Sequence, residues 1–317
     1  MQFKVEVKLA WMRWSVVAVF WLVWGVSCLQ SGTCQTAASG DLLRRVEDIA
    51  KTAHGKVGVA VEVLETKETC LFNGDEHFPM QSVYKLPIGI AVLHQVDSGL
   101  LQLQQMVRVE TKDMVPKLLH SPVRDAHPGG AELSLSNLLW QMVVESDGTA
   151  CDVLLRVLGG PSYVTRYLRE LGLTDVMVAT TEKEIGQDES AQYQNWTSPK
   201  ELCRLLRLLQ EGKGLSHSSR TLLLRCMSET STGSQRIKGL LPVGTPVAHK
   251  TGSSRTVNGL TRATNDAGII FLPDGRHLTI VVLISDSSAD ETTRESVIAK
   301  IAQAAWKHWA GGSPRER

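Results

Sequence analysis

The sequence predicts an α/β (α+β) fold: an antiparallel five-stranded sheet flanked by terminal helices, with an inserted and mainly helical lobe. β-like segments stand near both ends of the chain, and a long run of helical patterns separates them. One amphipathic helical pattern precedes the first strands and another follows the last. Because strands from both ends then share one sheet around an insert, we expect a sheet lobe of residues 39–80 and 228–317 and a helical lobe of residues 81–227.

The composition excludes several classes of protein. The chain has 317 residues, of which 43% are hydrophobic and 21% charged, as in globular proteins. The 34 Lys and Arg residues against 33 Asp and Glu give a net charge of +1, which provides no long-range field for a polyanion. We therefore expect no nucleic-acid partner, and the length is sufficient for a large hydrophobic core.

The N-terminal segment has the pattern of a targeting signal. Basic residues precede an apolar run from Trp14 to Leu29, which is shorter than the roughly 20 residues of a membrane-spanning helix. This order predicts a signal peptide and leader in residues 1–38, with cleavage after Cys28 or near Ala38. An uncleaved anchor and a lipid on Cys28 are the alternatives. Each of these exports the protein, so we expect a periplasmic or secreted protein without a stable membrane partner after cleavage.

Four cysteines remain in the mature sequence and are widely spaced. They form no CxxC pair or Cys/His cluster, so we expect no structural metal site. Four cysteines allow three complete disulfide pairings, and buried free thiols are the alternative. The four are Cys70, Cys151, Cys203 and Cys226.

The elements of the sheet lobe follow from their periodicity. Apolar residues at helical spacing predict a helix over 41–53, preceded by Ser39-Gly40 as its cap. Two strands follow it, and three more stand late in the chain, the last two joined by a hairpin turn at Asp274-Gly275. A long amphipathic helix over 291–309 ends the lobe. The five predicted strands are 56–64, 70–72, 246–249, 267–272 and 277–284.

The helical lobe is predicted from apolar stripes along the middle of the chain. A cleft between this lobe and the sheet is the expected place for a small-molecule site. The six striped segments are 86–96, 135–144, 149–158, 163–171, 199–209 and 221–227.

Ser82 and Lys85 form the first of four patterns that fit one reaction. A helix that begins near Ser82 places Lys85 one turn further along the same face. A serine hydroxyl becomes a good nucleophile when a neighbour takes its proton, and a lysine can do so if its pKa is lowered. The helix N-terminus also directs free backbone N–H groups at a developing oxyanion. About one S-x-x-K is expected by chance in a chain of this length, so the pattern needs support from others.

Two further patterns supply groups for proton transfer and anion binding. Ser146-Asp147-Gly148 precedes a predicted helix, where the serine could relay a proton and the Ser-Asp pair could equally be a helix cap. Lys250-Thr251-Gly252-Ser253 lies on or just after a predicted strand. Its lysine and hydroxyls could bind a carboxylate, and Gly252 would let a substrate lie against the strand edge. A surface turn is the alternative for this stretch.

The fourth pattern is a polar stretch, 180–194, between helical segments. Long polar loops inside a compact domain are usually functional or disordered. A carboxylate there could orient and deprotonate a water molecule, and Glu182 and Glu184 are the candidates. A solvated acidic loop is the alternative.

In this order, S-x-x-K, S-D-x and K-T-G resemble the motifs of class A serine β-lactamases and of the related penicillin-binding proteins. The intervals between the motifs favour class A, and the resemblance extends over residues 41–309. The segments 193–196, 247–250 and 263–266 are similar to the extended-spectrum branch of class A. The resemblance implies a β-lactamase that opens penicillins and cephalosporins through a serine acyl-enzyme, with no metal or organic cofactor.

The resemblance also implies roles for particular residues. Ser82 would be acylated, Lys85 would be part of its base, and Ser146 would pass a proton to the leaving nitrogen. The backbone N–H groups of Ser82 and Ser253 would form the oxyanion hole. The residues implied for binding the substrate carboxylate are Lys250, Thr251, Ser253 and Arg236.

The polar stretch matches the family's deacylation loop, with differences. Glu182 stands where the family has the base for deacylation, and Glu184 is the fallback. Gly186 replaces an asparagine that usually helps this base to position water, which weakens the expectation for deacylation relative to acylation. Thr180 and Asn195 stand where many relatives keep an Arg–Asp pair, so we expect the loop to fold as in the extended-spectrum branch and to leave a wider cleft.

Two more differences concern the cleft. Gly148 replaces the usual asparagine of S-D-N and so removes an amide that holds the substrate's side-chain amide. His120 falls where many relatives place an aromatic gate, and a surface histidine is the alternative. Two other functions stay open: a penicillin-binding DD-peptidase, which lacks the Glu182 base and stays acylated, and a non-hydrolytic β-lactam sensor. We expect a monomer.

Overall fold

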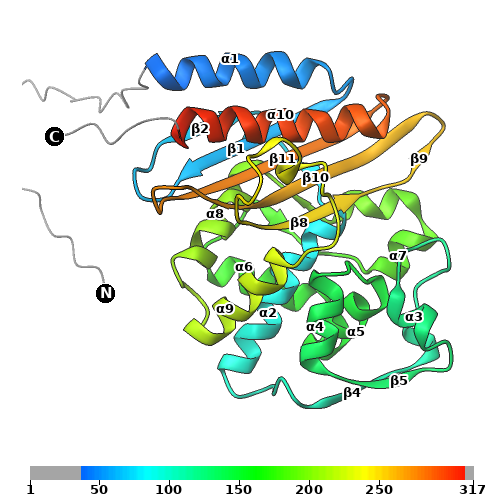
Figure 1. Cartoon of the computed structure of the whole chain (residues 1–317). Helices are drawn as coiled ribbons and strands as arrows, with labels where there is room; N and C mark the ends of the chain where they lie inside the picture. The colour runs from blue at the N-terminus through cyan, green and yellow to red at the C-terminus, as the bar shows by residue number, and fades with distance from the viewer. Residues whose placement is uncertain (1–36, 311–317) are drawn as a thin grey trace, which may run out of the picture. The chain divides into compact units, whose positions relative to one another are not determined.

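A central antiparallel sheet organises the computed structural model, which describes residues 37–310 (Figure 1). Five strands form the antiparallel sheet that was predicted, in the order β2-β1-β11-β10-β8, and the short β9 pairs with β10 as a sixth strand. The predicted signal peptide in residues 1–38 lies outside the described residues except for its last two. The strands of this sheet are β1 (Lys56–Val63), β2 (Thr69–Phe72), β8 (Val247–Ser253), β9 (Thr256–Val257), β10 (Leu260–Phe271) and β11 (His277–Ser287).

Helices α1 (Ala37–Lys51) and α10 (Glu291–Ala310) cover one face of the sheet (Figure 1). Their apolar stripes meet the outward-facing residues of the central strands, and Val46, Ile280 and Ile301 are fully buried in the cluster that results. Helix α1 begins before the predicted Ser39-Gly40 cap, and both residues lie within the helix. The predicted start at residue 41 was therefore wrong by one turn, whereas the final helix lies where it was expected.

The other face of the sheet carries the helical elements around the central α2 (Lys85–Asp97) (Figure 1). The first nine residues of α2 are all buried, which agrees with a helix that is apolar on nearly every side. One core cluster contains residues of α2 together with Ala248 of β8 and Val281 of β11, so the sheet and the helical insert pack directly together. The boundaries of the two lobes at 80/81 and 227/228 stay a prediction.

The remaining elements of this part of the chain are short. The α-helices are α3 (Pro122–Ala126), α4 (Leu135–Val143), α5 (Gly148–Leu158), α6 (Pro161–Glu170), α7 (Glu182–Gln187), α8 (Pro199–Gln210) and α9 (His217–Ser228). The 3-10 turns are η1 (Gln81–Tyr84), η2 (Thr111–Asp113), η3 (Glu189–Gln194) and η4 (Ile237–Leu240). Five further strands form two small sheets: β3 (Phe78–Pro79), β4 (Met106–Val109), β5 (Ala131–Ser134), β6 (Val176–Met177) and β7 (Trp196–Thr197).

Two strands extend further than their sequence patterns predict. Strand β8 continues through Lys250-Thr251-Gly252-Ser253, so this stretch is part of the sheet and not a surface turn. Strand β10 begins at Leu260, seven residues before the predicted start, and includes the fully buried Asn265 and Asp266. The polar side chains of both segments can be buried because they are hydrogen-bonded. Hydropathy alone does not detect such strands.

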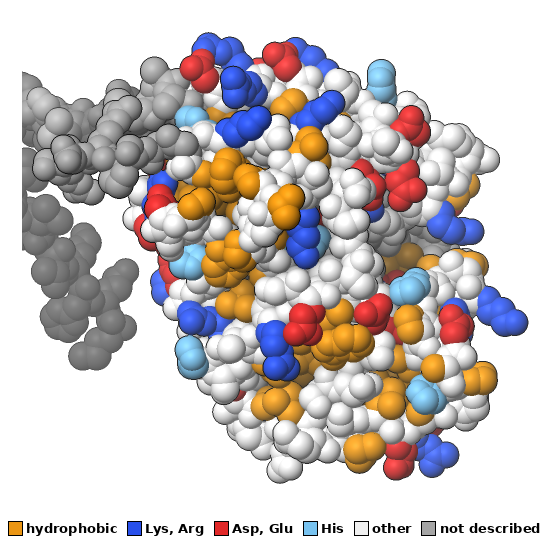
Figure 2. Space-filling view, viewed as in Figure 1, with side chains coloured by type: hydrophobic (Ala, Val, Ile, Leu, Met, Phe, Trp, Pro, Cys, Tyr) orange, Lys and Arg blue, Asp and Glu red, His pale blue; other side chains and the backbone are white. Residues whose placement is uncertain are grey.

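The surface drawn in Figure 2 mixes charges of both signs, with Lys and Arg side chains standing near Asp and Glu side chains. This distribution agrees with the net charge of +1. Within residues 37–310, no helix combines the length and the apolar character that a bilayer-spanning segment needs.

The four cysteines of the described residues are free thiols, and all four are buried. Of the two alternatives that the sequence left open, disulfides or buried free thiols, the structure has the free thiols. Burial raises the pKa of Cys203 to about 12 and that of Cys70 and Cys226 to about 11. Thiols of this kind are poorly reactive because little thiolate forms near neutral pH.

A thiol-labelling experiment tests this arrangement. In the native protein, we expect an alkylating reagent to leave peptides containing Cys70, Cys151, Cys203 and Cys226 unlabelled, because the thiols are buried and protonated. In denaturant without reductant, all four should be labelled, as read by peptide mass. Labelling that required a reductant would reveal disulfides and contradict the structure.

Candidate active site

Ser82 and Lys85 meet at the junction of η1 and α2. The 3-10 turn η1 carries Ser82, which is half-buried, and Lys85 is the first residue of α2. Lys85 Nζ donates a hydrogen bond to Ser82 Oγ at 2.9 Å. The structure thus brings the two residues together one turn apart, as the sequence predicts, although the turn at Ser82 is a 3-10 turn and not an α-helix.

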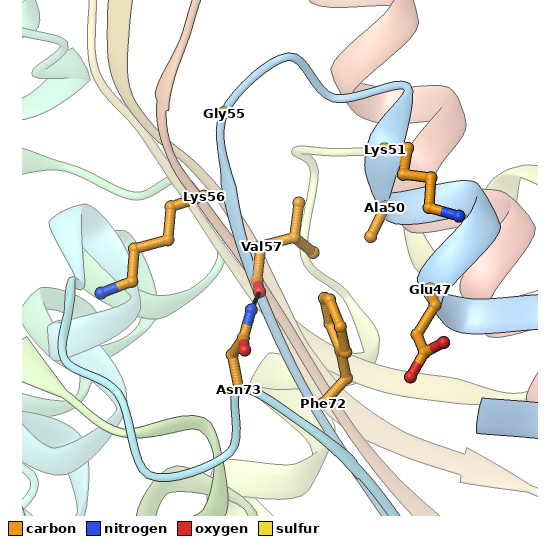
Figure 3. A pocket seen from close by; sticks show the side chains of 8 residues that line it. All are labelled: Glu47, Ala50, Lys51, Gly55, Lys56, Val57, Phe72 and Asn73. Carbon is orange, nitrogen blue, oxygen red and sulfur yellow. Dashed lines mark hydrogen bonds between the residues drawn. The ribbon is translucent and has the colours of Figure 1, made fainter. Parts of the chain in front are cut away.

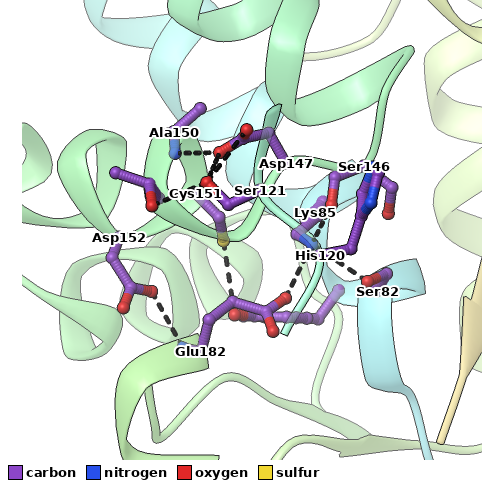
Figure 4. A network of polar contacts seen from close by, with 12 residues as sticks. Ser82, Lys85, His120, Ser121, Ser146, Asp147, Ala150, Cys151, Asp152 and Glu182 are labelled. Atoms are coloured by element: carbon purple, nitrogen blue, oxygen red, sulfur yellow. Dashed lines mark hydrogen bonds and ion pairs between the residues drawn. The ribbon is translucent and has the colours of Figure 1, made fainter. Parts of the chain in front are cut away.

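Lys85 is the hub of the polar network in Figure 4. Its side chain is 1% exposed, and its Nζ also donates to Ser146 O at 2.7 Å and lies 2.7 Å from Glu182 Oε1. Burial is the largest single influence and lowers the pKa of Lys85, but the Glu182 carboxylate and smaller contributions from other groups together outweigh it, so the net shift is upward. Lys85 is therefore charged near neutral pH, and its ammonium group faces three oxygen atoms: Ser82 Oγ, Ser146 O and Glu182 Oε1.

The Ser146 side chain is presented by a strained turn before α5. Ser146 has a φ of 59°, in the left-handed region, and Asp147 then caps α5 by accepting a hydrogen bond from Ala150 N at 2.7 Å. The Asp147 carboxylate also accepts from Ser121 Oγ and Val123 N, which fixes the turn. The helix-cap alternative is thus correct for Asp147, and it leaves the serine free to face the site.

Lys250 reaches Ser146 from the sheet. Its Nζ donates to Ser146 Oγ at 2.9 Å, and its side chain is fully buried. Burial, together with the positive charge of Lys85, lowers the pKa of Lys250 to about 7. Ser82, Lys85, Ser146 and Lys250 therefore line one site that is built from both lobes of the predicted fold.

The two acidic candidates of the polar stretch have different tasks. Glu184 Oε2 accepts hydrogen bonds from Thr181 N and from the hydroxyls of Thr180 and Thr181, which makes Glu184 part of the capping box of α7. The Thr181 N–H bond is the main cause that lowers the pKa of Glu184. Glu182 instead is 6% exposed and faces Lys85. The geometry favours Glu182 over the fallback.

The sequence analysis missed Asp152, which holds the N-terminus of α7. Its carboxylate accepts hydrogen bonds from Glu182 N at 2.8 Å and from Lys183 N at 2.9 Å. Burial, together with the Glu182 charge, raises the pKa of Asp152 to about 7. Asp152 lies in the middle of α5, where one acidic residue among mainly apolar neighbours is the one signal the sequence offered.

The loop that carries Glu182 is closed by an amide and not by an ion pair. Asn195 Oδ1 accepts from Ala179 N at 2.7 Å and Thr180 N at 3.0 Å, while Asn195 Nδ2 donates to Thr180 O at 3.0 Å. Asn195 O also accepts from Met80 N, close to Ser82. The predicted polar loop is thus ordered: it contains α7 and η3 and is tied to the turn of the serine.

The residues expected to bind a carboxylate gather at the end of β8. Arg236 Nη2 donates to Ser253 Oγ at 2.7 Å, and its Nη1 donates to Gly252 O at 3.2 Å. Thr251 Oγ1 lies 2.5 Å from Thr232 Oγ1. Arg236 is buried, so its contacts with the strand are shielded from water and are strengthened accordingly.

Gly252 allows β8 to approach the serine turn directly. A Cβ atom at Gly252 would lie 2.5 Å from Met80 O and 3.1 Å from Val83 N. Gly252 was expected to leave room for a substrate at the strand edge. Its missing side chain also lets η1 pack on the sheet. Asn265 on β10 completes this contact by donating to Pro79 O and Met80 O, and the sequence analysis assigned it no role in the site.

His120 and Gly148 lie beside Ser146. His120 is exposed, and its Nε2 donates to Glu145 O at 2.9 Å while its backbone O accepts from Gly148 N at 3.0 Å. Gly148 is buried at the start of α5, and a Cβ atom there would lie 3.2 Å from His120 O. Both residues therefore border the site, one at its surface and one inside.

A second pocket lies apart from this network (Figure 3). It measures about 370 Å³ and lies between α1 and the start of β1, with Lys51, Lys56 and Phe72 in its wall. It contains none of the residues that the sequence analysis selected. Among residues 37–310, no group of three or more His, Cys, Asp or Glu side chains is placed to hold a metal ion.

The geometry agrees with a comparison to known protein families. A family model described as the beta-lactamase enzyme family matches residues 41–309. The chain belongs to this family. Its β-lactamase relatives include the extended-spectrum beta-lactamase PER-1 of Pseudomonas aeruginosa, which is 42% identical over 86% of this chain and 89% of its own. Beta-lactamase VEB-1 of the same organism is 38% identical over 86% of this chain and 92% of its own.

Solved β-lactamase structures have the same fold. A β-lactamase from Chitinophaga pinensis shares 45% identity and a TM-score of 0.83, covering 84% of this chain and 98% of that one. The TLA-3 extended-spectrum β-lactamase shares 40% identity and a TM-score of 0.83, covering 86% and 99%. These findings confirm the predicted resemblance to extended-spectrum class A β-lactamases and the predicted hydrolase class.

The contact between β8 and η1 can be tested in this β-lactamase by Gly252→Ala. The added methyl group would collide with the backbone of the serine turn, so we expect the free energy of unfolding to fall by about 1–3 kcal/mol. Gly129→Ala is the matched control, because a Cβ atom there meets nothing within 4 Å. Denaturant unfolding of both variants provides the measurement, and equal stabilities would contradict the proposed packing.

Proposed function

We propose that the protein hydrolyses the β-lactam amide of penicillins and cephalosporins through an acyl-enzyme on Ser82. One observation carries the proposal: Lys85 Nζ lies within hydrogen-bonding distance of Ser82 Oγ, Ser146 O and Glu182 Oε1 at the same time. A nucleophile, a proton carrier and a carboxylate are thus held in one buried network. Relatives named as extended-spectrum β-lactamases support the same activity.

Acylation begins at the Ser82 hydroxyl. Because Lys85 is charged in the resting site, it cannot accept a proton unless it releases one first. The Glu182 carboxylate, 2.7 Å away, is placed to take that proton as Lys85 Nζ takes the proton of Ser82. Ser82 Oγ then bonds to the lactam carbonyl carbon, and the ring C–N bond breaks. The oxyanion accepts hydrogen bonds from the backbone N–H groups of Ser82 and Ser253.

The leaving nitrogen needs a proton, and Ser146 donates it. The proton that Glu182 took during acylation then returns through Lys85 to Ser146, so Glu182 is again a carboxylate before deacylation begins. The Ser146 hydroxyl is free to donate because Lys250 Nζ supplies the hydrogen bond to its oxygen. Lys250, Thr251, Ser253 and Arg236 bind the substrate carboxylate at the end of β8. Two of these four are cations, so the carboxylate receives charge-assisted hydrogen bonds in a site shielded from water.

Deacylation uses Glu182 and a water molecule. Glu182 Oε1 pairs with Lys85 Nζ at 2.7 Å and accepts from no other described residue, which leaves the carboxylate a lone pair for water. Glu182 takes a proton from this water as the oxygen attacks the ester, and the proton then returns to Ser82 as the product leaves. Glu182 is thus the residue that distinguishes hydrolysis from a permanently acylated protein.

The border of the site shapes substrate binding. Gly148 leaves the cleft without the amide that many relatives have, so side-chain recognition depends more on other residues. His120 is exposed beside Ser146 and contributes an imidazole edge at the mouth. We further propose that the chain acts as a monomer in the periplasm or outside the cell, exported by the signal peptide in residues 1–38.

Variants of the nucleophile and of the carboxylate test the two steps separately. Ser82→Ala should abolish acylation and lower kcat/KM by about 10³-fold or more, because no other hydroxyl replaces it. In Glu182→Ala, Lys85 loses the carboxylate that raises its pKa, and burial then favours a neutral amine that can accept the Ser82 proton itself. This variant should therefore still be acylated but should accumulate the adduct, since the water loses its base. Mass spectrometry of the protein mixed with a penicillin, together with nitrocefin turnover, provides both readouts.

Glu184→Ala is the matched control for the carboxylate. It removes the cap of α7 and costs stability, but it should not trap the adduct. The assignment fails if Glu184→Ala traps the adduct while Glu182→Ala turns over. A stable penicillin adduct on the unmodified protein, with negligible turnover, would instead favour a penicillin-binding protein.

The lowered pKa of Lys250 predicts a pH dependence. Lys250 is charged below about pH 7 and neutral above it, so kcat/KM for a β-lactam carboxylate should fall as the pH rises through about 7. Lys250→Arg keeps its charge throughout, because the pKa of arginine is about 12.5 or higher. Its kcat/KM should be lower but independent of pH in that range. Parallel profiles for the two proteins would contradict the assignment.

A further inference from the structure

We propose that Arg124 is a positioning residue for deacylation, because it holds the loop of residues 115–119 against the helix that carries Glu182. This inference rests on the proposed function and adds a residue that the reaction scheme does not include. Arg124 Nη1 donates to three carbonyl oxygens of the loop: Val115 O at 3.3 Å, Pro116 O at 2.7 Å and Leu119 O at 2.9 Å.

The three carbonyl contacts form a clamp. They come from one short loop and converge on a single nitrogen atom, and the Arg124 side chain is only 13% exposed. Hydrogen bonds from a charged donor are strong, and they are stronger still when water is largely excluded. The other end of the guanidinium pairs with Asp125, which is 66% exposed and therefore contributes little. The conformation of loop 115–119 depends on the clamp more than on this ion pair.

The clamped loop packs directly on α7. A Cβ atom at Gly186 would lie 2.9 Å from Leu119 Cδ1 and 3.1 Å from Pro116 Cγ. Glu182 and Gly186 are four residues apart and so share one face of α7. The loop therefore fills the space beside Gly186 and supports α7 on the face that presents Glu182. This contact also gives a reason for a glycine at a position where relatives carry asparagine.

The other end of the loop is attached beside Ser146. His120, which follows Leu119 directly, bonds to Glu145 O through its ring and to Gly148 N through its carbonyl. Ser146 itself is held independently by Asp147 and Lys250, and Ser82 is held by η1 against β8. Releasing the clamp should thus move Glu182 with α7 and leave the acylating serine in place.

The test separates the two chemical steps. In Arg124→Gln, we expect single-turnover acylation by nitrocefin to fall less than deacylation, because Lys85 stays beside Ser82 while the water loses the alignment of its base. Deacylation should slow between about tenfold and about 100-fold, as small displacements of a reacting group do. Arg124→Lys should recover part of the rate, because an ammonium group can still donate to the loop. Asp125→Asn is the matched control and should leave both rates unchanged.

A second pair of variants tests the contact if Arg124→Gln does not fold. Gly186→Ala should slow deacylation, because its methyl group meets Leu119. Combining it with Leu119→Ala should restore part of the rate, since the truncated side chain makes room. The proposal is supported if the double variant deacylates faster than Gly186→Ala alone. It is overturned if the two substitutions slow deacylation additively.

The outcomes distinguish this inference from the proposed function. If the unmodified protein turns over nitrocefin but Arg124→Gln deacylates at the same rate, only the inference is overturned. The inference is also overturned if acylation and deacylation fall equally, or if Asp125→Asn has the same effect as Arg124→Gln. If the unmodified protein does not turn over, the proposed function itself has failed.

Discussion

The buried ion pair between Lys85 and Glu182 is the constraint on which the site depends. Two charges that are almost fully removed from water are stable only when nearby groups satisfy their remaining hydrogen bonds. Ser82 Oγ and Ser146 O accept hydrogen bonds from Lys85. Asp152 fixes the start of α7, the helix of Glu182, by accepting a hydrogen bond from Glu182 N. The contacts proposed to act in catalysis are thus also the contacts that stabilise the buried charges of Lys85 and Glu182.

The same pair affects the groups around it. The positive charge of Lys85 adds to burial in lowering the pKa of Lys250, and the negative charge of Glu182 adds to burial in raising the pKa of Asp152. The site therefore contains groups, Lys250 and Asp152, whose pKa values lie near neutral pH. Such shifts are typical of functional sites, because they place proton donors and acceptors close to the working pH.

Much of the fold was accessible from the sequence because it depends on periodicity. The order of elements along the chain, the five-stranded antiparallel sheet and the terminal helices were all expected from the sequence pattern, and the structure agrees. The early start of β10 was missed because Asn265 and Asp266 are polar residues inside a buried strand, and their hydrogen bonds explain how they are buried. In the site, the residue types and intervals were sufficient to select Ser82 and Lys250, but they gave Asp152 and Arg124 no recognisable pattern.

The sequence by itself determined which functional groups are present and in what order, since a hydroxyl, an amine and a carboxylate keep their chemistry in any fold. The resemblance favoured Glu182, but only the tertiary structure shows which carboxylate meets Lys85. Glu182 and Glu184 are two residues apart in a polar loop, and the capping box engages one of them while the other faces the site. That choice depends on how α5, α7 and the sheet pack together, and no local pattern encodes contacts between segments so far apart in the chain.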